Sequence, residues 1–147
     1  MRPAIFQRMD VTTFYQLPAW PDQRADQRYE ETMQQIELAD ALDFPTVWLA
    51  ELHFEPNYGV MPSPFLFAAA AGQRTKRINI GTGVTLLPLH DPLRVAEEVA
   101  MLDNLSGGRL QLGIGRGGFQ QHYAGYGVSL SERQGRFEEA LEVLKRS

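Results

Sequence analysis

The sequence predicts an α/β fold with a parallel sheet, on three observations. Apolar runs of strand length begin at Thr46, Ile78 and Leu110, spaced 32 residues apart. A stretch with helical periodicity follows each run. A fixed period of strand plus helix implies successive right-handed βαβ units, whose strands run parallel. Doubly wound sheets and barrels both satisfy this pattern, but no Gly-x-Gly-x-x-Gly follows the first strand, so the dinucleotide fingerprint is missing.

The first half of the chain supplies two strands and two helices. A short strand is expected over 4–9, ahead of a loop rich in proline and tryptophan. Apolar residues recur at helical spacing over 26–42, which predicts an amphipathic helix. The continuously apolar run 46–50 is typical of a strand buried on both faces. A Ser-Pro pair at 63–64 provides an N-cap and a first helical residue, and so predicts a buried helix over 65–73.

The second half repeats the pattern. A strand rich in β-branched residues and glycine is expected over 78–87, and an Asp-Pro pair opens a helix over 91–105. A fourth strand follows over 110–114, and then a glycine-rich loop over 115–128. The Ser and Gln of segment 131–134 are spaced as a capping box, which predicts the start of a last amphipathic helix.

Composition and charge exclude several classes of function. The chain has 147 residues, a formal charge of −4 and no cysteine, which excludes disulfides, thiol nucleophiles and zinc–thiolate sites. It has no run of Lys and Arg, which argues against a nucleic-acid groove. No apolar stretch approaches the roughly 18 residues needed to cross a bilayer, and no secretory apolar region follows Met1. We therefore expect a cytoplasmic protein with no nucleic-acid or membrane partner.

Residues able to do chemistry gather where the predicted strands end. Glu51 and His53 follow the second strand, the segment 83–85 ends the third, and His90 lies further along the same connection. The segment 115–118 follows the fourth strand. Because the carboxyl ends of parallel strands share one edge, we expect these groups to converge on one face.

Glu51 and His53 are the candidate catalytic residues. The reference pKa of histidine is near neutrality, so His53 could act as a general acid or base. It could equally be a buried histidine that is hydrogen-bonded to the backbone. Glu51 could be an acid, could orient His53 or Arg116, or could form a surface salt bridge.

Arg116 is the candidate ligand-binding charge. Glycine on both sides of it lets the backbone approach a flat or anionic ligand, and a guanidinium suits phosphate or carboxylate. The alternative is an ion pair with Glu51. His90 is expected in a capping or loop role, and His122 is expected to be solvent-exposed in a mobile loop. The histidines at 53, 90 and 122 lack metal-ligand spacing, so no metal site is predicted.

Several segments resemble the bacterial luciferase-like flavin monooxygenase family. The run 47–54 is similar to that family's strand and loop, whose common form is Glu-His-His-Phe. Further similar segments are 80–83, 87–88, 91–94, 96–98, 102–109 and 112–117. Together they form a specific signal, much stronger than any single motif, and the similarity covers essentially the whole chain.

The resemblance implies a (β/α)8 TIM barrel that binds reduced flavin, as FMN, at the C-terminal mouth of its strands. The flavin would react with O2 and an organic substrate, or pass hydride to a substrate. The resemblance also implies that Arg116 contacts the flavin phosphate and that Gly115 lies against the isoalloxazine ring. The Gly83–Val84 peptide, with Thr85 beside it, is implied to be a non-proline cis bond against the flavin. A deazaflavin cofactor is the weaker alternative, because related families share the barrel and the cis peptide.

One residue departs from the family form. Leu52 stands where the family has its first histidine, and a leucine cannot move a proton. Light emission from an aldehyde is therefore not expected. His53 matches the second histidine, so a family member with another substrate fits better than a luciferase.

The length corresponds to four of the eight units of a barrel, which usually needs about 250 residues. We therefore expect residues 1–147 to form the N-terminal half of a barrel, as a fragment, a split half or an obligate partner. The partner would be a second copy or a complementary C-terminal half, and a separate flavin reductase could supply the electrons. The alternative is a non-catalytic half-barrel whose exposed edges serve assembly.

Overall fold

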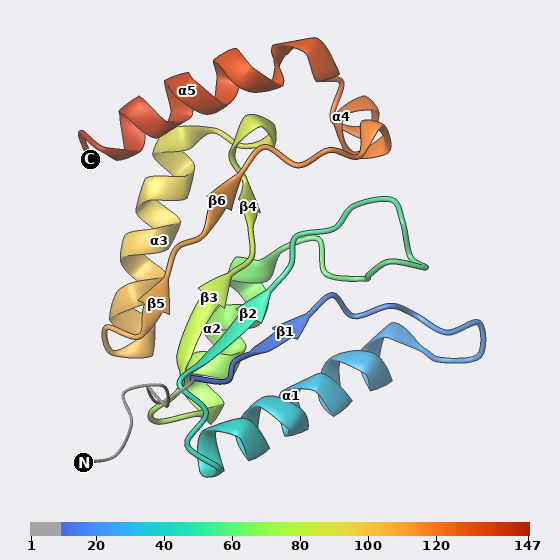
Figure 1. Ribbon diagram of the computed structural model, residues 1–147, viewed down its shortest axis with the longest axis vertical. Coiled ribbons are helices and arrows are strands. Elements are labelled where there is room, and N and C mark those ends of the chain that lie inside the picture. Colours follow the sequence, from blue (N-terminus) through green and yellow to red (C-terminus); the bar gives the residue numbers. More distant parts are fainter. Residues whose placement is uncertain (1–9) are drawn as a thin grey trace, which may run out of the picture.

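The computed structural model describes residues 10–147, so the strand expected over 4–9 lies outside the described residues. Along the chain, helices follow single strands or pairs of short strands (Figure 1). The strands are β1 (Thr13–Tyr15), β2 (Thr46–Leu49), β3 (Asn79–Thr82), β4 (Thr85–Leu86), β5 (Leu110–Gln111) and β6 (Ile114–Gly115). The helices are α1 (Ala25–Ala41), α2 (Pro64–Arg74), α3 (Pro92–Ser106), α4 (Gln120–Gly125) and α5 (Arg133–Leu144), with 3-10 turns η1 (Leu87–Leu89) and η2 (Leu130–Glu132).

The main sheet is parallel and has the order β1-β2-β3-β5. This arrangement confirms the α/β class that the repeat predicts. β1 was not expected from the sequence, because it is only three residues long and carries no apolar run. It pairs with β2 at the edge of the sheet, so that Phe14 lies beside Trp48 and Trp48 lies beside Gly81.

The third and fourth predicted strands are each divided into two pieces, which corrects the expectation of continuous strands over 78–87 and 110–114. The Gly83–Val84 peptide is cis and separates β3 from β4, which pairs with β6 in a small second sheet. The side chain of Thr82, the last residue of β3, is hydrogen-bonded to the segment between β5 and β6. Its Oγ1 donates to the carbonyl of Gly113 at 2.7 Å and accepts from the amide of Gly113 at 3.0 Å.

The main core lies between the sheet and the helices α1 and α2. Val47 and Leu49 of β2 and Ile80 of β3 pack there with Ile36 of α1 and Ala71 of α2, and all five are buried. Successive side chains of a strand point to opposite faces, so the residues that alternate with these point to the other face of the sheet.

That other face, which we call the inner face, holds two aromatic residues. Phe14 is 54% exposed. The indole of Trp48 lies against the backbone of Gly81, where an added Cβ would come within 2.3 Å of the ring. Glycine at this position therefore allows a large ring to lie flat across the neighbouring strand.

Helix starts follow the local signals in two cases and depart from them in one. Ser63 caps α2 and Asp91 caps α3, each through its side chain, as the sequence predicts. The capping box expected of Ser131 and Gln134 does not form. The side chain of Ser129 instead caps the short turn η2, from which α5 continues.

Candidate active site at the strand ends

Glu51 is the centre of a buried polar cluster just beyond β2. Its Oε1 accepts hydrogen bonds from Nε2 of His53 at 2.8 Å and from Nε2 of His90 at 2.7 Å. Its Oε2 accepts from the backbone amide of Leu86 at 2.9 Å. The residue is only 4% exposed, so the surface salt bridge considered for it is wrong. Of the two orientations considered, Glu51 holds His53 and not Arg116.

Glu51 and His90, whose contact is 2.7 Å long, stabilise each other's charged form. Burial raises the pKa of Glu51, but the hydrogen bonds from His53 and His90 outweigh burial and keep this pKa below its usual range. Burial lowers the pKa of His90, but the hydrogen bond and charge of Glu51 outweigh it and raise this pKa above its usual range. A carboxylate and a readily protonated imidazole therefore lie together.

His90 lies in the bend after η1, as expected, where its backbone amide donates to the carbonyl of Leu87 at 3.1 Å and caps η1. Its ring also pairs with Glu51, which the sequence does not predict. The turn η1 folds the chain back over the strand ends, which brings His90 to a carboxylate 39 residues away in sequence. Sequence spacing gives no sign of this contact, because it depends on how two separate connections meet.

His53 is buried, and both of its ring nitrogens are engaged. Nε2 donates to Glu51, and the hydroxyl of Tyr126 lies 3.2 Å from Nδ1. The backbone amide of His53 donates to Nε2 of His122 at 3.4 Å. The histidine thus connects Glu51 with the segment that carries α4.

His122 is only 1% exposed, which corrects the expectation of an exposed residue in a mobile loop. Part of the glycine-rich stretch forms the helix α4, and this helix packs on the segment that follows β2. The ring of Phe54 lies against Gly125, where an added Cβ would come within 2.1 Å of it. The side chain of Gln121 also donates to Glu55. These contacts join segments far apart in the sequence, so the composition of the stretch does not predict them.

A cavity of about 170 Å³, which we call the mouth cavity, opens at the carboxyl ends of the strands. Its wall includes Glu51, Leu52, Gly83, Val84, Phe119 and His122. The Gly83–Val84 peptide is cis, as the resemblance implies, and both of its residues line the cavity. Ligand pockets usually measure roughly 300–1,000 Å³, so the mouth cavity matches only part of a ligand site.

The other residues expected to bind cofactor, Thr85, Gly115 and Arg116, do not line this cavity. Thr85 is fully buried in β4, and its Oγ1 has no hydrogen-bond partner within residues 10–147. Gly115 packs against the side chain of Val84, where an added Cβ would come within 2.5 Å of a methyl group. Arg116 is exposed and hydrogen-bonds to Gln134 rather than to Glu51, so the ion pair considered for it is wrong.

A second guanidinium lies near Arg116. Arg116, Ser131, Arg133 and Gln134 line an open hollow at the start of α5, which we call the arginine hollow. Two guanidinium groups beside a hydroxyl and an amide suit an anionic group.

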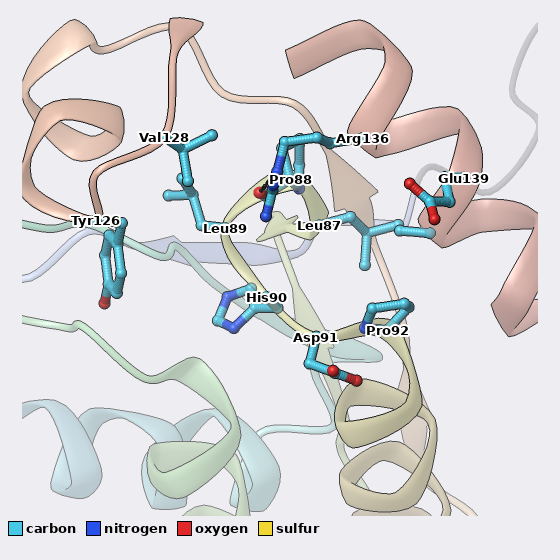
Figure 2. A pocket seen from close by; sticks show the side chains of 11 residues that line it. Leu87, Pro88, Leu89, His90, Asp91, Pro92, Tyr126, Val128, Arg136 and Glu139 are labelled. Carbon is cyan, nitrogen blue, oxygen red and sulfur yellow. Dashed lines mark hydrogen bonds between the residues drawn. The ribbon is translucent and has the colours of Figure 1, made fainter. Parts of the chain in front are cut away.

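A larger pocket of about 420 Å³, the outer pocket, lies between η1 and α5 (Figure 2). His90, Tyr126 and Arg136 line it, and Arg136 is fixed by donation from its Nε to the carbonyl of Pro88 at 2.8 Å. His90 thus touches the outer pocket on one side and Glu51 on the other.

Metal clusters and membrane spans are both absent from the described part of the chain. Residues 10–147 contain no group of three or more His, Asp or Glu side chains placed to hold a metal ion. Within the same residues, no helix is both long and apolar enough to cross a membrane.

The sequence over residues 8–147 matches the family model described as luciferase-like monooxygenase. The chain belongs to this family. Limonene 1,2-monooxygenase of Rhodococcus erythropolis is 36% identical over 143 residues, which are 96% of this chain and 36% of the relative. The 4-hydroxyprotoasukamycin monooxygenase of Streptomyces nodosus subsp. asukaensis is 40% identical over 76% of the chain and 30% of the relative. The chain therefore spans about a third of the length of the curated relatives it matches.

Solved structures confirm the fold class, a TIM-barrel type of which this chain forms part. Monooxygenase RslO1 from Streptomyces bottropensis is 36% identical with a TM-score of 0.86, covering 92% of this chain and 42% of its own. The oxygenating constituent of 3,6-diketocamphane monooxygenase from Pseudomonas putida has a TM-score of 0.88 over 94% of this chain and 40% of its own, but at 23% identity it shows the fold alone.

Proposed function

We propose that the protein is a flavin-dependent oxidoreductase that uses reduced FMN and O2 to oxidise an organic substrate. The observation that carries this proposal is the mouth cavity at the carboxyl ends of the strands, with Glu51, Gly83 and Val84 in its wall. The oxygenase component of a flavin-dependent trigonelline monooxygenase from Acinetobacter baylyi is 34% identical over 78% of the chain and 32% of the relative, which supports the choice of cofactor.

The residues around the mouth cavity fit one edge of a flat, polar ring system. Gly83, Gly117 and Gly118 line the cavity without side chains, and Val84 adds only a small apolar one. Gly83 and Val84 would lie against the ring, and Gly115 packs on the side chain of Val84. Bound reduced flavin supplies the electrons that activate O2, and the surrounding protein orients the ring and excludes water.

Glu51 and His53 are proposed as the acid–base pair of the site. Glu51 lines the cavity, and its carboxylate stays ionised because two histidines and an amide donate to it. His53 does not line the cavity but holds a proton on Nε2 against Glu51, and Tyr126 keeps the ring in place. We therefore assign proton holding to His53 and contact with the ligand to Glu51.

Arg116 is proposed to bind the FMN phosphate in the arginine hollow. Changing Arg116 to Ala should weaken reduced-FMN binding about 10- to 100-fold, because a hydrogen bond to a charged group is worth about 1.5–3 kcal/mol. Riboflavin, which lacks the phosphate, should bind both proteins equally. Anaerobic titrations followed by flavin absorbance test this, with Arg94→Ala on the exposed face of α3 as the control. Equal weakening of FMN and riboflavin would contradict the assignment.

A deazaflavin is the second candidate cofactor. A coenzyme F420-dependent tetrahydromethanopterin reductase from Methanopyrus kandleri matches with a TM-score of 0.58 and 25% identity, over 82% of this chain and 31% of its own. Parallel titrations with reduced FMN and with reduced F420 distinguish the two, and the tighter ligand identifies the class.

The site is proposed to be completed by further protein, either a complementary C-terminal half or a second copy of the chain. The small volume of the mouth cavity and the uncovered inner face both support this proposal. A separate reductase is proposed to supply reduced flavin, in line with the oxygenase component named above. Light scattering and intact-mass measurement give the oligomeric state, and the anaerobic titration gives the affinity for FMN. A monomer of this chain that bound reduced FMN tightly by itself would contradict completion by other protein.

A further inference from the structure

His122 is a buried histidine with one ring nitrogen still to be used. Its Nε2 accepts the backbone amide of His53 at 3.4 Å, so the neutral ring carries its proton on Nδ1. Nδ1 is buried, and it has no hydrogen-bond partner among residues 10–147. A buried N–H without a partner is unfavourable and rare in folded proteins, so the atom calls for a partner outside this set.

The surroundings of His122 favour its neutral form. Burial is the first cause that lowers the pKa of His122, and the charge of nearby His53 lowers it further. The carboxylates of Glu51 and Glu55 oppose this shift without reversing it. A neutral ring with a backbone donor on Nε2 is a hydrogen-bond donor of fixed orientation.

The ring is held at the mouth cavity by aromatic contacts on two sides. The ring centroid of His122 lies 5.0 Å from that of Phe119 and 5.5 Å from that of His53, in an edge-on arrangement with the latter. His122 and Phe119 both line the cavity, together with apolar Leu52 and Val84. The oxygens of Glu51, which also lines it, are already occupied by three donors.

We propose that Nδ1–H of His122 donates a hydrogen bond to a neutral acceptor of the ligand bound in the mouth cavity. The acceptor is a carbonyl oxygen, of either the flavin ring or the organic substrate. This inference rests on the proposed function for the identity of the ligand, but its geometry does not. α4 then forms the wall of the site that recognises polar atoms, with Phe54 and Gln121 holding the helix in position.

Selective 15N labelling of the three histidines tests the donor directly in the purified protein. We expect His122 to be the Nδ1–H tautomer between pH 6 and 8 and to remain so without ligand. Reduced FMN, added without oxygen, and cyclohexanone, added alone, are the two probes. The probe that shifts the Nδ1–H signal identifies the source of the carbonyl.

Variants measure the size of the effect. His122→Phe removes both ring nitrogens. It should weaken the binding of the probe that shifts the Nδ1–H signal about tenfold. His122→Gln keeps a donor and an acceptor, and should restore affinity to within about threefold of the unchanged protein. Gln120→Ala, on an exposed position of the same helix, is the matched control and should bind as the unchanged protein does.

The outcomes separate this inference from the proposed function. If cyclohexanone shifted the Nδ1–H signal and FMN did not bind, the proposed cofactor would be wrong and His122 would remain the donor. An Nε2–H tautomer, or an Nδ1–H signal that neither probe moves, would overturn the inference. These signals come from the unchanged protein, so the result stands even where His122→Phe does not fold.

Discussion

The two buried regions of this molecule are built on opposite principles. The core between the sheet and α1 and α2 is apolar, with Ile36, Val47 and Leu49 each fully buried. The layer beyond the strand ends is equally buried but polar, with Glu51 and His53 at 4% and 3% exposure. A single residue, Ala50, separates Leu49 from Glu51, so the change from one principle to the other is abrupt.

The difference shows which region stabilises the chain and which region carries its ionisable chemistry. Apolar packing is stabilised in proportion to the area removed from water and responds little to pH. A buried charge is tolerated only when donors surround it, and its stability depends on protonation. The first region fixes the strands, and the second presents ionisable groups at their ends, as parallel barrels do.

The largest effect should come from the apolar region. Leu49→Ala removes a fully buried side chain and leaves a cavity, so the free energy of unfolding should fall by about 2–5 kcal/mol. The loss should be the same at pH 5 and pH 8, because no ionisable group is involved. Urea unfolding at the two pH values measures it, and a loss that changed strongly with pH would break the contrast between the regions.

Removing the charge at the centre of the polar layer should cost nearly as much. Glu51→Gln keeps the size of the side chain but weakens hydrogen bonds from His53 and His90 and sets an amide near the Leu86 N–H. We expect a loss of about 2–3 kcal/mol at pH 7. The pKa of Glu51 is lowered in the folded protein, so this contribution is present above about pH 4.5 and disappears as the pH falls further.

The same urea series tests that expectation. The difference between the unchanged protein and Glu51→Gln should shrink below about pH 4.5, as the carboxyl is protonated first in the unfolded chain and, at lower pH, in the folded one. A difference that stayed constant down to pH 3 would mean that packing, and not charge, is lost.

The smallest effect should come from His90, which is partly open to the outer pocket. Its pKa is raised in the folded protein, so its contribution is complete below about pH 6.5 and is lost as the pH rises through the folded value. The stability advantage of the unchanged protein over His90→Gln should therefore decline from pH 6 to pH 8. An advantage that grew with pH would have the opposite sign and would break the pairing of His90 with Glu51.

Local signals in the sequence predicted the parts of the fold that local physics decides. Ser63 and Asp91 cap helices because their side chains reach amides within three residues. The apolar run 46–50 likewise predicted the position of β2. β1 escaped prediction because an edge strand of three residues is defined by its partner and not by its own composition.

The site was predictable only where neighbouring residues make it. The pairing of Glu51 with His53 links residues two apart and was among the orientations considered. The roles of His90 and His122 depend on contacts across 39 and 69 residues, through η1 and α4, which no spacing reveals. The cis peptide followed from the family resemblance alone, since Gly83 and Val84 by themselves give no sign of it.

The placement of Trp48 gives the chain a built-in optical reporter. Of its two tryptophans, Trp20 is 65% exposed, whereas the indole of Trp48 lies on the inner face against Gly81. Indole emission moves to shorter wavelength when water is displaced from the ring. Whatever covers the inner face therefore shifts the emission wavelength of Trp48, and Trp20→Phe leaves Trp48 as the one tryptophan, which follows this assembly without an added label.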